Sequence, residues 1–398
     1  MTTRAVRCPL HTSDYTTSPH PAVFDELADS GPVHRISLPG EVPAWLITER
    51  DLAERTLRDP RLVKDPMRVA RYGQPVGSRR VPDDFASVGG RTIMNLDGDD
   101  HVRIRRVIGR RLSGAALTTA RPMVEALVHR RLDTIARCDT VELVEDFAVP
   151  LVTDVIGQLF GVREDFTRAI ITHGSKLFGP QHPADPDMLE AYPLLVQALN
   201  GALDEGLSKE GRDDLLGDLL AAQRDGRLRK RETMSNLALL MIAAADPVIA
   251  LISRGVALVR ADSHARAELL HGDADAVVES LLREQPPIPF TGWRFATEPM
   301  DLAGHSVAPG DAILVLIPAA NRTVDAGYRQ GHLSFGGGVH RCPGGHLARI
   351  ETVAALRGLF SRFPDLRLEL PFEEWVWVGG IGPRVPQRVP VLLNGAAR

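Results

Sequence analysis

The stretch FGGGVHRCPGG, Phe335 to Gly345, constrains the fold more than any other part of the chain. Glycines on both sides of Cys342 free the backbone to turn sharply and let a flat object approach closely. A helical pattern, GHLARIETVAALRGLF, begins at once, and N–H groups at a helix start lower the pKa of a thiol that faces them. From this local pattern three interpretations stay open for Cys342: an inert cysteine in a tight turn, a nucleophile, or a metal ligand.

The hydrophobic pattern predicts a mainly α fold with a smaller β part. PVHRIS and AWLIT are typical of strands, and DLAERTLRD is typical of a helix. From about residue 113 to 270 the period is helical almost throughout. After residue 286 an alternating segment predicts a small sheet, and a helix follows the glycine stretch. No linker or repeat divides the sequence, so we expect one large domain over residues 1–398.

Composition excludes several classes of function. The net charge is −4 and aromatic residues make up 5%, so nothing favours nucleic-acid binding. Cys8, Cys138 and Cys342 show no metal or disulfide spacing, which fits a reducing cytoplasm. The first twenty residues lack an apolar run, so we expect no signal peptide or anchor. Leu237 to Ile252 is apolar but short and contains Asp and Pro, which predicts a buried helix and no membrane association.

The longer sequence FGGGVHRCPGGHLARIE resembles the haem-ligand loop of the cytochrome P450 superfamily, whose pattern is Phe-x-x-Gly-x-His-x-Cys-x-Gly. Phe335, Gly338, His340, Cys342 and Gly344 fall on that pattern. The resemblance implies the P450 fold, with haem b between a long central helix and the helix after the cysteine loop. It also implies that the Cys342 thiolate binds the haem iron, because a thiolate pushes electron density onto iron and favours O–O cleavage.

The resemblance covers nearly the whole chain. NLDGDDHVRIRRVIGRRLSG resembles the segment that places a His and an Arg over the haem edge, here His101 and Arg105. Their i,i+4 spacing puts both on one helical face, where they suit haem propionates. Without the resemblance, these arginine-rich turns would indicate a solvated basic face. The haem contacts that the resemblance implies are His101, Arg105, Arg294, Phe335, Gly336, His340, Cys342 and Gly344.

One departure from the family pattern lies in the long central helix. The family has Ala-Gly-x-acid-Thr, and this chain has AAADPV, from Ala243 to Val248. Asp246 keeps the acid, but Pro247 stands where the threonine hydroxyl normally helps to deliver protons. Proline also cannot donate to the carbonyl of Ala243, which predicts a kink. Asp246 and Pro247 are therefore the predicted catalytic positions.

Two more departures concern the support of the cysteine loop. The family's Glu-x-x-Arg falls in VESLLREQPP, where Arg283 is present but Ser280 takes the glutamate position. Glu279 stands one residue early and is predicted to point away from that network. The segment TVDAGYRQGHLS, residues 323 to 334, is also shorter than usual. We therefore expect an altered network behind the haem loop.

The resemblance implies a haem-thiolate oxidoreductase that acts on a small or medium organic molecule in bacterial specialised metabolism, by monooxygenation, oxidative coupling or rearrangement. Electrons would come from NAD(P)H through a ferredoxin and a ferredoxin reductase, with Arg106, Arg341 and Arg349 expected to steer an acidic ferredoxin. Without the threonine hydroxyl, the substrate supplies the proton relay, or peroxide or a step without oxygen activation is used. The alternative is an atypical haem protein or auxiliary partner without turnover.

The substrate pocket follows only from the resemblance. Residues 376 to 383 are expected to form its rim. The predicted lining residues are Leu240, Met241, Ala244, Ala245, Val248, Ile288 and Phe290. Each of these residue types is more often plain core than substrate contact.

Overall fold

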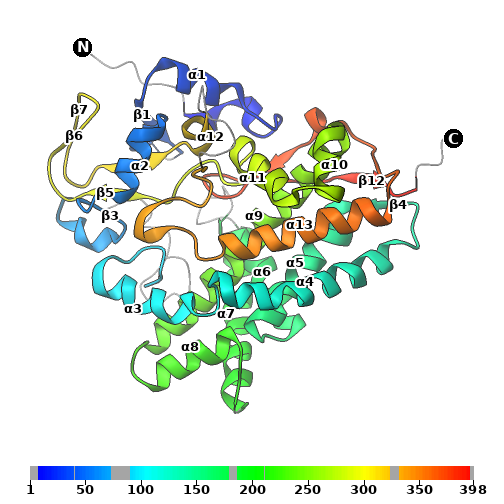
Figure 1. The fold of residues 1–398 in the computed structure, drawn as a ribbon. Coiled ribbons are helices and arrows are strands. Elements are labelled where there is room, and N and C mark those ends of the chain that lie inside the picture. Colours follow the sequence, from blue (N-terminus) through cyan, green and yellow to red (C-terminus); the bar gives the residue numbers. More distant parts are fainter. Residues whose placement is uncertain are drawn as a thin grey trace.

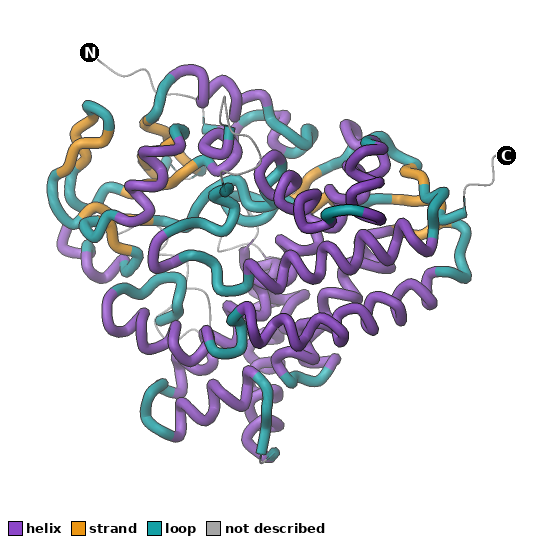
Figure 2. The backbone as a smooth tube through the Cα atoms, viewed as in Figure 1, coloured by secondary structure: helices purple, strands orange, loops and turns teal. Residues whose placement is uncertain are grey.

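Helices form most of the molecule, and short strands gather at two places beside them (Figure 1, Figure 2). The computed structural model describes residues 8–39, 41–72, 90–178, 186–209, 211–322 and 331–394. Its α-helices are α1 (Ala22–Ser30), α2 (Arg50–Arg58), α3 (Gly98–Gly109), α4 (Gly114–Ile135), α5 (Val149–Phe160), α6 (Glu164–Phe178), α7 (Pro186–Ser208), α8 (Leu215–Arg224), α9 (Lys230–Ala261), α10 (Ser263–His271), α11 (Ala274–Glu284), α12 (Ile317–Asn321) and α13 (Gly345–Arg362).

The larger sheet has the strand order β1-β2-β8-β5-β3. It therefore pairs strands from residues 33–63 with strands from residues 294–315. β2 and β8 are parallel, and the other neighbours in this sheet are antiparallel. The smaller sheets pair β4-β12-β9, β6-β7 and β10-β11. The strands are β1 (Val33–Leu38), β2 (Val42–Ile47), β3 (Leu62–Val63), β4 (Thr140–Glu142), β5 (Arg294–Ala296), β6 (Met300–Leu302), β7 (His305–Val307), β8 (Ala312–Val315), β9 (Arg367–Leu368), β10 (Trp377–Val378), β11 (Val385–Pro386) and β12 (Pro390–Leu392).

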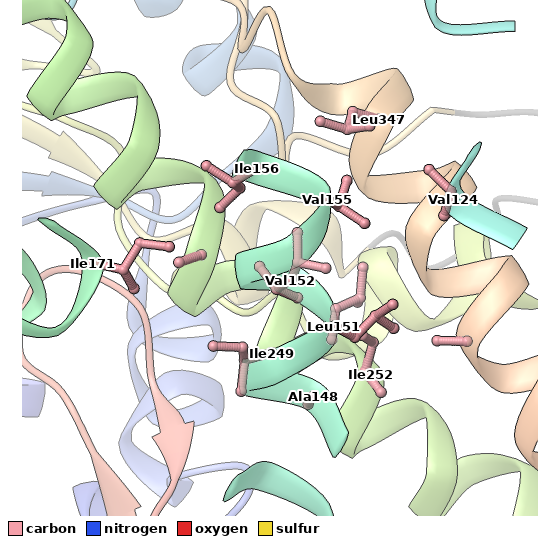
Figure 3. Packing of buried hydrophobic residues seen from close by; sticks show 14 of the residues in the cluster. Val124, Ala148, Leu151, Val152, Val155, Ile156, Ile171, Ile249, Ile252 and Leu347 are labelled. Atoms are coloured by element: carbon pink, nitrogen blue, oxygen red, sulfur yellow. The ribbon is translucent and has the colours of Figure 1, made fainter. Parts of the chain in front are cut away.

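The long helix α9 is the centre of the helical core. It packs against α5, α6 and α13, and most of its side chains are buried. Figure 3 shows part of this core, where side chains of α5 such as Val152 lie beside Ile249 and Ile252 of α9. α9 is long and apolar enough to cross a membrane, but 78% of its most apolar window is buried inside the protein, as is typical of a core helix.

The predicted secondary structure agrees with the fold. PVHRIS and AWLIT form most of β1 and β2, DLAERTLRD forms α2, and the segment after the glycine stretch forms α13. The helical region is interrupted by β4 and by a π-helical turn over Leu143–Ala148, which the helical period does not predict. α9 continues through Pro247 to Ala261, so the proline does not end the helix.

The crossing of α9 and α13 depends on a glycine. A Cβ atom at Gly255 would lie 2.6 Å from Cδ1 of Leu356, which is fully buried on α13. The absence of a side chain at Gly255 therefore lets the central helix and the helix of the cysteine loop approach closely.

We predict that Gly255→Val lowers the free energy of unfolding by about 1–3 kcal/mol, because the added methyl groups crowd Leu356. Chemical denaturation measures this change. Gly109→Ala is the control, since nothing lies within 4 Å of a Cβ atom there, and it should leave stability unchanged or slightly raised. Equal unfolding midpoints for Gly255→Val and the control would show that the crossing tolerates a larger residue.

Candidate active site

The glycine-rich loop turns back on itself and places Cys342 just before α13. The backbone N–H of Cys342 donates to the carbonyl of Phe335 over 2.9 Å. Gly338 has a φ of 65°, and a Cβ atom there would clash with the carbonyl oxygen of Leu57 at the end of α2. Glycine at position 338 is therefore required both by the turn and by the close approach of the loop to α2.

The thiol of Cys342 lies close to two backbone N–H groups and to Arg105. Its side chain is accessible to solvent, yet enough protein surrounds it that burial raises the pKa of the thiol above its ordinary value. Backbone N–H groups of Gly344 and Gly345 bond to the sulfur and, with the nearby Arg105, oppose that rise. Donors aimed at the sulfur stabilise a thiolate, and a bound metal ion deprotonates a coordinating thiol outright. These contacts fit a metal ligand.

The propionate-binding side chains predicted from the sequence converge beside this loop. The ring of His101, on α3, lies 4.2 Å from the ring of His340, centroid to centroid. Nε2 of His340 donates to Oδ1 of Asp97 over 3.4 Å. Arg294, on β5, is buried and donates to the carbonyl of Leu57 over 3.3 Å. The charge of Arg294 also lowers the pKa of His340. The side chains from α3, β5 and the loop are therefore close enough to interact electrostatically.

Lys64 is a further basic residue in this cluster, and no sequence motif predicts it. It follows β3, whose Val63 pairs with Phe295 of β5, so the antiparallel register sets Lys64 beside Arg294. Burial and the charge of Arg294 lower the pKa of Lys64 to about 7. Only the strand pairing could have revealed Lys64, because its sequence neighbours resemble no binding motif.

The cluster suits a ligand with two negative charges. Nε2 of His101 is buried without a hydrogen-bond partner among the described residues, and burial together with His340 and Arg105 lowers the pKa of His101 to about 4. Asp97 is the carboxylate in contact with these groups in the described part of the chain. Because buried cations need anionic partners, the residues present fit the two propionates of a haem.

Asp246 lies on α9, and Ser175 on α6 donates a hydrogen bond to it. The distance from Ser175 Oγ to Asp246 Oδ1 is 3.1 Å. Burial raises the pKa of Asp246 to about 6, and the bond from Ser175 opposes that rise. One turn before Pro247, Ala243 is exposed although it lies in the middle of a core helix. This part of α9 therefore borders accessible space and carries a carboxyl group that titrates near neutral pH.

The predicted pocket residues divide into two groups. Ala244 and Ile288 are partly accessible. The remaining predicted pocket residues are buried, namely Leu240, Met241, Ala245, Val248 and Phe290. Phe290 packs in the core of the sheet end, whereas the buried α9 residues pack in the helical core. Ala243 and Pro247, which share one face of α9 with i,i+4 spacing, are more accessible than most of the predicted lining.

The cysteine loop is held by an ion-pair network that does not use the family's Glu-x-x-Arg pair. Glu279 of α11 pairs with Arg349 of α13, where Arg349 Nη2 lies 3.0 Å from Glu279 Oε2. Nε2 of His332 donates to the same oxygen over 3.2 Å. The guanidinium of Arg349 lies 4.5 Å from the ring centroid of Phe335. Glu279 therefore connects α11 to both ends of the loop.

The partners of Glu279 were not predicted from the sequence, because Arg349 lies on another helix and His332 precedes the loop. Although burial raises the pKa of Glu279, the bonds from His332 and Arg349 lower it to about 2. Arg283 and Ser280 do contact each other, with Arg283 Nη2 lying 3.2 Å from Ser280 Oγ. Residues 323–330 of the shortened segment lie outside the described residues, so that prediction stays a prediction.

A mainly helical fold with a cysteine loop beside a cluster of buried cations defines a haem-thiolate protein. The chain is 31% identical to 6-deoxyerythronolide B hydroxylase of Saccharopolyspora erythraea over 94% of this chain and 95% of that protein. It is 29% identical to the cytochrome P450 monooxygenase PikC of Streptomyces venezuelae over 92% and 88% of the two chains. No family model matches the chain.

Solved structures agree with these relatives. The cytochrome P450 CxnD, for C–S bond formation in chuangxinmycin biosynthesis, superposes with a TM-score of 0.87 at 26% identity and covers 99% of this chain and 98% of its own. The tirandamycin C-bound P450 monooxygenase TamI has a TM-score of 0.84 at 28% identity, covering 96% and 99%. The chain belongs to the cytochrome P450 superfamily and is a P450-type oxidoreductase, as the resemblance of its cysteine loop predicted.

We predict that Glu279→Gln destabilises the protein by about 1 kcal/mol, a modest loss because the carboxylate is partly exposed. It should also increase the fraction of reduced, CO-bound protein without a thiolate-type Soret band, because Arg349 no longer fixes the loop. The stability difference should narrow as the pH falls from about 4 towards 2, where the wild-type carboxylate becomes protonated. Asp275→Asn, an exposed change on the same helix, is the control. Identical Soret bands and stabilities for both variants would refute the role of Glu279.

Proposed function

We propose that the protein oxidises a small or medium organic molecule in bacterial specialised metabolism, with haem b held through Cys342. The observation that carries this proposal is the convergence of a donor-supported thiol with a buried cation cluster. The relatives support it, since their printed names include monooxygenases and hydroxylases. The proposed reaction is a monooxygenation or an oxidative coupling, performed in the cytoplasm.

The residues have separable roles in holding the cofactor. Cys342 binds the iron as a thiolate, and the N–H groups of Gly344 and Gly345 stabilise its charge. His101 and His340 would donate hydrogen bonds to the propionates. Arg105, Arg294 and Lys64 would pair with the propionate charges. When bound, the haem supplies the oxygen-activating redox chemistry of the family. The Phe335 ring of the loop packs against the guanidinium of Arg349, and this contact helps to keep the thiolate in place.

Asp246 and Ser175 form the proposed proton relay. With a pKa of about 6, Asp246 can both take up and release a proton near neutral pH. The hydroxyl of Ser175 donates to Asp246 from α6, so a hydroxyl is present although Pro247 has none. The relay thus uses a neighbouring helix in place of the missing threonine.

Electrons are proposed to come from a ferredoxin and its reductase. Arg341 is exposed on the loop two residues after the exposed Val339, and Arg106 is exposed on α3 one turn after the exposed Val102. Exposed basic residues with apolar neighbours suit an acidic protein partner. Arg349, which was expected to join them, is instead paired with Glu279 and is assigned to the loop.

The second candidate function is a haem protein without oxygen-dependent turnover. Pro247 favours it, because the helix offers no hydroxyl at the position where the family has threonine. Turnover with a redox partner, turnover with peroxide, and rearrangement without oxidant separate the two candidates.

We predict that Cys342→Ser abolishes the thiolate-type Soret band of the reduced, CO-bound protein and abolishes turnover. Cys138→Ser is the matched control, because Cys138 is an exposed cysteine elsewhere in the chain. A wild-type protein that shows no Soret band after reconstitution would count against haem itself. An unchanged thiolate band in Cys342→Ser would show that another group is the ligand.

We predict that Asp246→Asn slows oxygen-dependent turnover by about 10²–10⁴-fold, because the amide cannot transfer protons. Turnover driven by peroxide should fall less, and the thiolate Soret band should stay. Ser175→Ala should produce a smaller loss of the same kind, since it removes only the donor to Asp246. Asp262→Asn, at the end of the same helix, is the control. A wild-type rate in Asp246→Asn would remove Asp246 from the relay.

A further inference from the structure

Two buried arginines meet on one tryptophan ring, away from the cysteine loop. Arg254 lies on α9 and Arg384 directly precedes β11, and each is 2% exposed. The guanidinium carbon of Arg254 lies 4.1 Å from the ring centroid of Trp377, and that of Arg384 lies 5.4 Å from it. Two like charges thus share one aromatic surface inside the protein.

The hydrogen bonds of the two guanidiniums are unequal. Arg384 donates to the carbonyls of Tyr15, Ser18 and Pro19, and so holds the N-terminal segment. Arg254 has one long bond, 3.4 Å, to the carbonyl of Arg384. The Nε atoms of both arginines are buried without a partner in the described structure. Arg384 therefore stabilises the N-terminal segment. Arg254 keeps N–H groups that donate to no acceptor among the described residues.

No carboxylate among the described residues forms an ion pair with either arginine. Asp14 influences Arg384 only at longer range, and it accepts a hydrogen bond from the N–H of Ala22. Burial and the charge of Arg384 lower the pKa of Arg254 to about 9, so Arg254 still carries its charge at neutral pH. A buried cation is strongly unfavourable unless an anion meets it.

The position of Arg254 connects it to the accessible part of α9. Arg254 follows Pro247 by seven residues, which is two helical turns, so both lie on the same face about 10 Å apart. Ala243, one turn before Pro247, is exposed, and Pro247 is partly exposed. Ala250 and Leu251, which lie between Pro247 and Arg254 along this helix, are buried, so a molecule beside Ala243 reaches Arg254 only if the protein packed over these residues opens.

We propose that Arg254 binds the carboxylate of an elongated substrate whose other end lies beside Ala243 and Pro247. This inference rests on the proposed function and adds a substrate class to it. A planar guanidinium matches a carboxylate bidentately, and Trp377 offers an apolar surface to the adjoining chain. The turn between β10 and β11, residues 379–382, contains three glycines, and the Tyr15 hydroxyl donates to the carbonyl of Gly380 there, so admitting the carboxylate requires this bond to break.

The test compares two probes of equal length, dodecanoate and dodecan-1-ol, by titration of the ferric holoprotein in optical difference spectroscopy. Dodecanoate should bind about tenfold or more tightly than the alcohol, because only the carboxylate forms charge-assisted hydrogen bonds. Arg254→Met should remove that preference and leave alcohol binding unchanged. Arg260→Met, an exposed arginine on the same helix, should keep the preference. Equal affinities in the wild type, or a preference that survives in Arg254→Met, would overturn the proposal.

Thermal unfolding gives a second measurement that does not depend on haem spectra. Without probe, Arg254→Met should melt at the same or a higher temperature than the wild type, because it removes an unpaired buried charge. Dodecanoate should raise the melting temperature of the wild type but not that of Arg254→Met. A variant that melts lower and still responds to dodecanoate would show a purely structural role. An intact thiolate Soret band with no carboxylate preference overturns only this inference, whereas loss of the wild-type band overturns the proposed function.

Discussion

Positive charge inside the protein, without an equal number of carboxylates, is the constraint on which the rest of the structure depends. Burial lowers the pKa values of Lys64, Arg294 and the two histidines where β3, β5, α3 and the cysteine loop meet, and the charge of Arg294 adds to this effect at Lys64 and His340. Such an arrangement is unfavourable on its own, because repulsion and lost hydration act in the same direction. An anionic ligand replaces repulsion between the basic groups with attraction to the ligand. Because it binds only the folded protein, its binding free energy adds to the stability of the fold.

The cysteine loop is held by contacts from several elements rather than by one motif. Gly338 allows the loop to touch α2, Gly255 allows α9 to approach α13, and Glu279 ties α11 to Arg349. Each contact joins segments that are far apart in the sequence. The altered Glu-x-x-Arg pattern is therefore compensated in space by a glutamate one position earlier, which reaches a different helix.

The fold class, the main elements and the family followed from the sequence, because the glycine-cysteine stretch and the helical periods are local signals. The strands of the sheet end were also predicted, since their alternation is local. Lys64, Ser175 and Arg254 could not be predicted, because their importance depends on strand register and helix crossings that local periodicity does not encode. The partners of Glu279 could not be predicted for the same reason, since helical geometry gives the direction of a side chain but not the residue that it meets.

The proline of α9 has a consequence for molecular discrimination. Because Pro247 lacks an N–H, the carbonyl of Ala243 loses its usual donor in a stretch of helix that borders accessible space. Apolar walls distinguish molecules by size, and one methylene changes binding by only about 1–3 kcal/mol. A backbone acceptor distinguishes them by the presence or absence of a single donor, which is a far stricter criterion. The same site can thus tolerate variation in the carbon skeleton while rejecting a molecule that lacks one correctly placed hydroxyl or amide.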